Sequence, residues 1–291
     1  MSMNENNTIL SLANKLTGKH ILLGLAAVTF MLLACDHRLC VKEYTLEASG
    51  ITSPVRIALI TDLHNSKYGK NQCQLLDAIH KQSPDLILLG GDLFDDSDAH
   101  PHTEQFLSGI AGKYPCYYVT GNHEHRHGPD SFAIRMGILE KYNIPVLSGS
   151  FETISVNGQT VSICGVDDPM SIMSNSGEPL VPFEEQLRAV SAAAEKDGCT
   201  VLLSHRPEYF ETYCGYDFDL VLCGHAHGGQ WRIPLLLNGL YAPQQGLFPK
   251  YAGGLYRENG TAMIVSRGLC RGKSFIPRIF NRPEVVIIDL V

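Results

Sequence analysis

From residue 55 onward, short apolar runs alternate with segments whose apolar and polar positions follow a helical period. Apolar runs bounded by Gly, Pro, Asn or Asp predict strands, whereas apolar residues spaced three and four apart predict helices. Strands are expected at residues 55–61, 85–89, 114–120, 200–203, 220–223, 263–266 and 285–290. Helices are expected at residues 72–81, 103–111, 131–142 and 182–196. This alternation predicts βα units and therefore an α/β fold with parallel strands.

Two regions depart from this alternation. Residues 151–156 and 160–165 are joined by Asn157-Gly158, a pair that favours the tight turn of an antiparallel hairpin. The sheet is therefore expected to change from parallel to antiparallel at this point. Residues 228–256 are rich in Gly, Pro and aromatic residues and follow neither period, so we expect a long irregular loop there. Such loops are typical of functional segments.

The amino-terminal region has a different character. Residues 1–20 form a polar tail, and residues 21–35 form a run without a charged side chain. A transmembrane helix needs about 17 to 25 apolar residues, so this run is short for one. It fits a transmembrane anchor, a cleaved signal or, because it ends in Leu-Leu-Ala-Cys35, a lipoprotein signal. We expect membrane attachment through this segment, with residues 36–54 as a linker and first strand before a domain at residues 55–291.

Composition narrows the class of protein. The chain has 291 residues, of which 44% are hydrophobic and 18% charged, which is typical of a globular protein with a substantial core. The net charge of -7 and the absence of a run of Lys and Arg argue against nucleic acid as a partner. The nine cysteines are scattered without Cys-x-x-Cys spacing, so neither a zinc ribbon nor a disulfide framework is expected.

Polar motifs stand where expected strands end. They are Asp62-Leu-His64, Gly91-Asp92-Leu-Phe-Asp95, Gly121-Asn122-His123-Glu124, Ser204-His205-Arg206 and Gly224-His225-Ala-His227. The carboxyl ends of parallel strands lie at one edge of a sheet, so these side chains are expected to converge. Carboxylate, amide and imidazole donors suit Mn, Fe or Zn, and no thiolate is expected among them. The sequence therefore predicts a metal site.

The motifs resemble the signature of the calcineurin-like metallophosphoesterase superfamily, which runs D-x-H, G-D-x-x-D, G-N-H-[DE], H, G-H-x-H. The resemblance extends from about residue 56 to the end of the chain, and residues 224–230 are similar to the branch of membrane-attached bacterial phosphodiesterases. It implies a four-layer α/β/β/α sandwich of two mixed sheets flanked by helices, with a dinuclear metal site at the carboxyl ends of the strands. It also favours an extracytoplasmic catalytic domain.

The same resemblance implies a role for each motif residue. Two divalent metal ions are expected: one is bound by Asp62, His64 and His227, the other by Asn122, His205 and His225, and both by Asp92. A hydroxide between the two ions would be the nucleophile. His123 would protonate the leaving group as general acid, and Asp95 would orient His123. A helix cap or a solvated acid remains an alternative role for Asp95.

The activity that the resemblance implies is hydrolysis of a phosphodiester or pyrophosphate bond. The substrate class is a lipid-linked or nucleotide-linked phosphoester, and a monomer is expected. Protein phosphatases of the superfamily have Arg where this chain has Asp96, which disfavours a phosphoprotein substrate. The alternatives are a phosphomonoesterase or nuclease that uses the same site, and a binding module of the same fold without catalysis.

Overall fold

The computed structural model describes residues 3–97, 99–169, 171, 181–193, 198–271 and 277–291. The chain divides into a unit at Met1–Asp36, whose described part is helix α1 (Met3–Ala34), and a compact unit at His37–Val291. None of the described helices has the stretch of apolar sequence that crossing a bilayer requires. This finding does not support the transmembrane helix expected at residues 21–35.

The compact unit contains strands β1 (Cys40–Leu46), β2 (Val55–Ile60), β3 (Leu86–Leu89), β4 (Cys116–Tyr118), β5 (Ser150–Val156), β6 (Gln159–Gly165), β7 (Cys199–Leu203), β8 (Leu220–Cys223), β9 (Tyr241–Ala242), β10 (Gly246–Leu247), β11 (Gly254–Glu258), β12 (Thr261–Val265) and β13 (Glu284–Leu290). Its α-helices are α2 (Cys73–His80), α3 (Pro101–Ile110), α4 (Gly128–Lys141), α5 (Phe183–Ala193) and α6 (Phe210–Tyr213). Short 3₁₀ helices are η1 (Lys70–Gln72), η2 (Pro207–Tyr209) and η3 (His227–Gly229).

Two mixed sheets form the centre of this unit. The first has the order β1-β13-β2-β3-β4, and the second has the order β11-β12-β8-β7-β6-β5. In the first sheet β2, β3 and β4 are parallel, and in the second β6, β7, β8 and β12 are parallel. The expected hairpin is present, since β5 pairs with β6 in antiparallel register. The parallel strands bring their carboxyl ends to one edge of each sheet.

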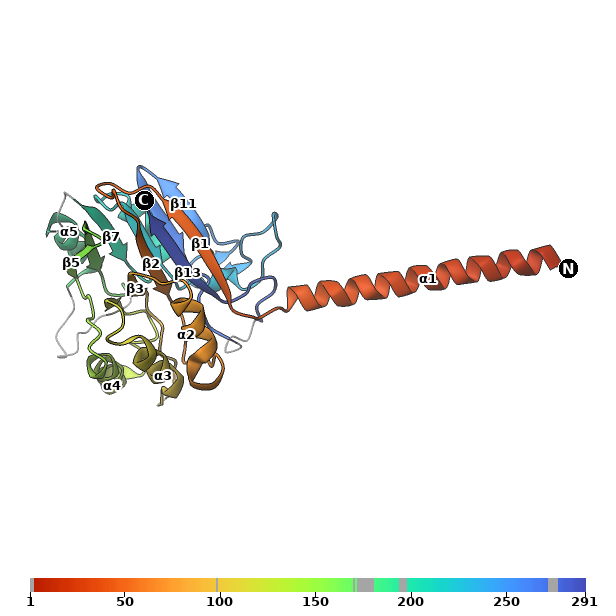
Figure 1. Ribbon diagram of the computed structural model, residues 1–291, viewed down its shortest axis with the longest axis horizontal. Helices are drawn as coiled ribbons and strands as arrows, with labels where there is room; N and C mark the ends of the chain where they lie inside the picture. The colour runs from red at the N-terminus through yellow and green to blue at the C-terminus, as the bar shows by residue number, and fades with distance from the viewer. Residues whose placement is uncertain (1–2, 98, 170, 172–180, 194–197, 272–276) are drawn as a thin grey trace. The chain divides into compact units, whose positions relative to one another are not determined.

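Alternate side chains along the strands face either the other sheet or the outer helices. Ile57 and Leu59 of β2 pack with Val201 and Leu203 of β7 in one apolar cluster between the sheets. The residues between them face outward, because successive side chains of a strand point to opposite faces. Thus Ile60 packs against α2, α3 and α4, whereas the outer face of the second sheet packs against α5 and α6. The four-layer α/β/β/α architecture is confirmed (Figure 1).

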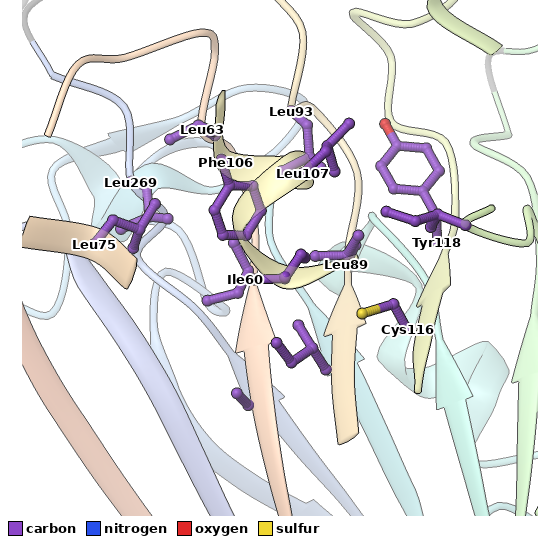
Figure 2. Packing of buried hydrophobic residues seen from close by; sticks show 14 of the residues in the cluster. Ile60, Leu63, Leu75, Leu89, Leu93, Phe106, Leu107, Cys116, Tyr118 and Leu269 are labelled. Carbon is purple, nitrogen blue, oxygen red and sulfur yellow. The ribbon is translucent and has the colours of Figure 1, made fainter. Parts of the chain in front are cut away.

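The helical layer on the first sheet is tightly packed. Phe106 and Leu107 of α3 lie over Ile60 of β2 and Leu89 of β3 (Figure 2). All four side chains are fully buried. Burial of each such side chain stabilises the fold by about 1.5 to 3 kcal/mol. This packing fixes the ends of β2 and β3, from which the first two polar motifs extend.

Residues 228–256 differ from the expectation of a loop without regular structure. They contain the antiparallel pair β9–β10, and the last residues of the segment belong to β11, which pairs with β12. Strands of two residues are too short for an alternating pattern to reveal them. The remainder of the segment is irregular, as expected from its composition.

Candidate metal centre

The loops that follow β2 and β3 are joined by backbone hydrogen bonds. The amide of Asp62 donates to the carbonyl of Gly91 over 3.0 Å, and the amide of His64 donates to the carbonyl of Asp92 over 3.0 Å. Asp62 and Asp92 both have positive φ, at 52° and 53°. Non-glycine residues adopt such angles at a cost, and they persist where surrounding structure enforces them. The two carboxylates are therefore held in defined positions.

Asp92 lies at the centre of the cluster. Its Oδ2 is 3.2 Å from Nε2 of His205 and 3.7 Å from Nε2 of His64. Its Oδ1 accepts a hydrogen bond of 2.8 Å from the amide of His123. Burial by itself would raise the pKa of Asp92, but the surrounding histidines, His205 first, lower it well below its ordinary value. The site therefore favours positive charge beside this carboxylate.

Asp62, His64 and His227 form one side of the cluster. Nε2 of His227 is 3.7 Å from Oδ1 of Asp62, and the rings of His64 and His227 stack with centroids 5.2 Å apart. Burial lowers the pKa of His227 to about 3, so its imidazole is neutral at physiological pH. A neutral imidazole has a lone pair to offer to a metal ion.

His205 and His225 form the other side. Nδ1 of His205 donates to the carbonyl of Gly90 over 2.8 Å, which directs Nε2 toward Asp92. Nδ1 of His225 is 3.2 Å from Nε2 of His205. Burial, and then the nearby charge of His205, lower the pKa of His225 well below its ordinary value. A backbone carbonyl on the second ring nitrogen is the usual way to orient a metal-binding histidine.

The residues fit divalent cations. Oδ1 of Asn122 is buried and has no hydrogen-bond partner among the described residues. An unsatisfied buried oxygen costs about 1 to 3 kcal/mol, and a cation would remove that cost. Among the described residues, three groups of side chains each bring their ligand atoms within 4.8 Å of one another: His64, Asp92 and His123; Asp92, His205 and His225; and His64, His227 and Cys270. Direct contacts thus link six of the seven expected ligands: Asp62, Asp92, His64, His205, His225 and His227.

His123 differs from expectation in its carboxylate partner. Its Nδ1 lies 2.9 Å from Oδ1 of Asp96, whereas Asp95 was the expected partner. Asp95 instead accepts a hydrogen bond of 3.2 Å from the amide of Ser97 and lies 3.3 Å from Nδ1 of His100. The turn that follows β3 directs neighbouring carboxylates to different partners. Asp96 is therefore a residue placed to orient His123.

Glu124 connects two of the loops. Its buried carboxylate accepts hydrogen bonds from the amides of Asp92, Phe94 and Gly121, at 2.9, 3.3 and 2.6 Å. Burial, and then the charge of Asp92, raise the pKa of Glu124 to about 7. The side chain thus ties the loop after β3 to the loop after β4, and it positions Asp92 and Asn122 relative to each other.

Arg206 is fully buried, although its sequence position also suits a surface charge. Its guanidinium pairs with the carboxylate of Asp168 at 2.5 and 3.0 Å, and Nη1 lies 2.9 Å from Nε2 of His225. A paired, buried guanidinium satisfies its donors within the protein. Arg206 therefore supports His225 and is held away from bulk solvent.

Sequence reasoning missed several residues at this centre: Asp96, Glu124, Asp168, Gln244 and Cys270. Glu124 lies inside one of the motifs, and that position was a usable signal. Gln244 lies within residues 228–256, where a loop typical of functional segments was expected, whereas Cys270 lies far along the chain from any motif and nothing local distinguishes it. Gln244 contacts His225, with 2.7 Å between its Oε1 and Nε2 of the histidine.

Comparisons with known proteins agree with this geometry. A family model described as Calcineurin-like phosphoesterase matches residues 55–229. The chain is 30% identical over 244 residues to Phosphodiesterase YaeI of Escherichia coli, which covers 82% of this chain and 83% of that protein. It is 28% identical over 264 residues to Uncharacterized metallophosphoesterase YkuE of Bacillus subtilis, with coverage of 87% and 86%.

Solved structures share the fold. NAD nucleotidase of Haemophilus influenzae matches 75% of this chain with a TM-score of 0.52 and 17% identity. A 5'-nucleotidase precursor from Thermus thermophilus matches 82% of this chain with a TM-score of 0.52 and 15% identity. The matches cover 46% and 54% of those two chains, so this protein spans about half of their length. At such identities the likeness shows the fold alone.

Proposed function

Because the chain belongs to the calcineurin-like phosphoesterase family and is a dinuclear-metal phosphoester hydrolase, we propose that it cleaves a phosphodiester or pyrophosphate bond. One observation supports this most strongly: side chains that follow β2, β4, β7 and β8 converge around the buried carboxylate of Asp92, which itself follows β3. The relative YaeI is named a phosphodiesterase, which supports a diester over a monoester.

The ligand assignment follows the two sides of the cluster. Asp62, His64 and His227 would hold one ion, Asn122, His205 and His225 would hold the other, and Asp92 would be a ligand of both. The donors suit Mn, Fe or Zn. When bound, two such ions activate a water molecule and neutralise charge on the phosphoryl oxygens. Two carboxylates do not neutralise two divalent ions, so the centre attracts an anionic substrate despite the acidic chain.

His123 is the general acid in this proposal. Its backbone amide donates a hydrogen bond to Oδ1 of Asp92. Its ring contacts the ring of His64 edge to face, with centroids 4.5 Å apart. The side chain is 19% exposed, so the ring is open to a bound substrate at the edge of the cluster. Nδ1 of His123 contacts Asp96, so Nε2 of the same ring is the nitrogen that faces the leaving-group oxygen and delivers a proton to it. Such proton transfer contributes about 10²- to 10⁴-fold to rate.

The test is hydrolysis of bis-p-nitrophenyl phosphate by the purified full chain supplied with Mn. Wild-type protein should turn over this diester, and His123→Ala should lose about 10²- to 10⁴-fold in kcat while its metal content stays nearly unchanged. A control is His20→Ala, because His20 is exposed on α1, outside the compact unit that contains the cluster. Absence of turnover in metal-loaded wild type would favour a binding module, and full activity of His123→Ala would remove the general acid.

An acyl-bearing, lipid-linked or nucleotide-linked substrate is proposed from the segment that follows the last motif. Gln244 of this segment contacts His225, and Leu236 and Leu247 of the same segment are strongly exposed. Exposed apolar side chains in a segment that reaches the polar centre suit a substrate with an apolar tail. Leu236→Ser and Leu247→Ser should slow hydrolysis of an acylated phosphodiester and spare bis-p-nitrophenyl phosphate. Leu255→Ser, at a partly exposed position on β11, is the control.

Attachment to a membrane, with the catalytic domain outside the cytoplasm, is also part of this proposal. It is supported by the exposed apolar side chains of α1, such as Leu22, Leu25 and Leu32. An apolar helix of this kind can lie in the membrane interface without crossing it. Fractionation of cells that produce the full chain should place it with membranes, and Leu25→Asp should release part of it. Recovery of the wild-type chain entirely in the supernatant would contradict the proposal.

A further inference from the structure

Cys270 brings a thiol to the side of the metal centre that contains His64 and His227. The ligand atoms of these three residues all lie within 4.8 Å of one another. We infer that the Cys270 thiolate is a further ligand of the ion held by Asp62, His64 and His227. This inference rests on the proposed dinuclear centre, and it changes the chemistry of one of its two sites.

The backbone on both sides of Cys270 is anchored. The amide of Leu269 donates to the carbonyl of Thr61 over 3.1 Å, and the hydroxyl of Tyr68 donates to the carbonyl of Leu269 over 2.5 Å. The amide of Arg271 donates to the hydroxyl of Ser66 over 3.0 Å. The side chain of Leu269 is fully buried in the apolar cluster of the helical layer (Figure 2). Residue 270 is therefore held beside the strand end that provides Asp62.

Gly268 lets this loop approach the ligand closely. It has a φ of +71°, and a Cβ built there would lie 2.6 Å from Cβ of Asp62. Only glycine combines this backbone angle with such a short approach. The loop after β12 is thus shaped to pass directly over Asp62, and Cys270 follows two residues later.

A buried positive charge lies near the thiol. Arg278 is 6% exposed and interacts electrostatically with Cys270 and Asp62. Its Nη1 is buried and has no hydrogen-bond partner among the described residues. A guanidinium near a cysteine balances the negative charge of a metal-bound thiolate. Metal uptake would release the thiol proton to solvent.

A buried cysteine can also be an ordinary small apolar residue, and Cys116 provides the comparison. Both cysteines are 8% exposed. Cys116 lies among apolar side chains on β4, and burial alone raises its pKa to about 12. Cys270 instead lies with two imidazoles and a guanidinium. Cys270 therefore has the surroundings of a metal ligand, whereas Cys116 has those of a core residue.

The consequence concerns metal choice. The sequence motifs alone led to the expectation that no thiolate takes part. A thiolate at one site favours Zn or Fe over Mn there, because soft sulfur binds the later metals more strongly. The second site, with Asn122, His205 and His225, keeps only nitrogen and oxygen donors. The two positions are therefore expected to differ in metal preference.

Cobalt substitution of the full chain tests the inference directly. Metal-free protein loaded with two equivalents of Co²⁺ should show a sulfur-to-cobalt charge-transfer band in the near ultraviolet. Cys270→Ala should lose this band, and Cys116→Ala should keep it. The zinc-loaded wild type should show a sulfur neighbour at about 2.3 Å by X-ray absorption, again absent only in Cys270→Ala. Thermal unfolding of the metal-free variants controls for loss of fold.

A band that persists in a folded Cys270→Ala protein, or a zinc-loaded wild type without a sulfur neighbour, would overturn the inference. Neither result depends on turnover. The bis-p-nitrophenyl phosphate assay reports separately on the proposed function, so a wild type that is active yet shows no sulfur ligand would reject Cys270 alone.

Discussion

Nδ1 of His123 lies 2.9 Å from Oδ1 of Asp96, while the neighbouring Asp95 lies 3.3 Å from Nδ1 of His100. Two adjacent carboxylates thus contact two different histidines. Asp96 also pairs with Arg126 over 3.1 Å. Burial opposes ionisation of Asp96, but His123 and Arg126 lower its pKa below the ordinary value. Asp96 is therefore ionised and placed to hold the His123 ring in one orientation.

Asp96→Asn should lower kcat for bis-p-nitrophenyl phosphate about tenfold. The loss is smaller than the full contribution of a general acid, because His123 remains and only its orientation is weakened. The loss should be larger for a diester with an alkyl leaving group, because a poorer leaving group depends more on protonation. The measurement is the ratio of kcat for the two substrates, which a purely structural effect would leave unchanged. Asp95→Asn is the matched control, and a greater ratio change in that variant would restore Asp95 to the role first expected for it.

Gly268→Ala should impair the metal centre more than the fold. A left-handed angle costs an alanine about 1 to 2 kcal/mol, and Gly260→Ala pays the same cost because its φ is +89°. Nothing lies within 4 Å of a Cβ at residue 260, whereas at residue 268 it meets Asp62. We expect similar losses of unfolding free energy from strain, with an additional loss of metal content and turnover only in Gly268→Ala. Equal metal content in both variants would contradict the close approach.

Removal of metal should abolish turnover and leave the fold in place. Two extensive apolar clusters pack the sheets together and against the helices, and neither includes a proposed metal ligand. Each ion present at 100 times its Kd should add about 2.7 kcal/mol to the free energy of unfolding. The measurement is thermal unfolding and turnover with chelator and after Mn is restored. Persistent turnover in protein shown to be metal-free would contradict a metal-dependent reaction.

Glu208 should make stability depend on pH. Its Oε2 is buried without a hydrogen-bond partner in the described part of the chain, and burial raises the pKa of this carboxyl from 4.5, although Arg206 and His205 oppose the rise. The folded protein therefore holds this proton more tightly than the unfolded chain does. The contribution of Glu208 to the free energy of unfolding should fall as pH rises from 4.5 through the raised pKa.

Glu208→Gln removes the titrating group and keeps the shape of the side chain. The difference in unfolding free energy between this variant and wild type should shift in favour of the variant as pH rises from about 4.5 toward neutrality. Denaturant unfolding at several pH values measures it. A difference that does not change with pH would show that Glu208 has the same pKa in the folded and unfolded states.

Much of the fold and the centre could be predicted from the sequence. The strands β2, β3, β7 and β8 follow from short apolar runs, because a buried parallel strand needs apolar side chains on both faces. The motifs at their ends follow from the rule that such ends share one edge of the sheet. Strands as short as β9 and β10 leave no pattern, so the hairpin within residues 228–256 was not predictable.

What the sequence alone determined is the set of donors that follow the strands, since local pattern and strand direction suffice to bring Asp62, Asp92 and His205 to one edge. Only the tertiary structure decided which neighbours these donors meet. The choice of Asp96 over Asp95 depends on how one turn is directed, and Cys270 reaches His64 through a loop anchored far along the chain. Contacts of this kind depend on distance in space, and separation along the chain does not predict that distance.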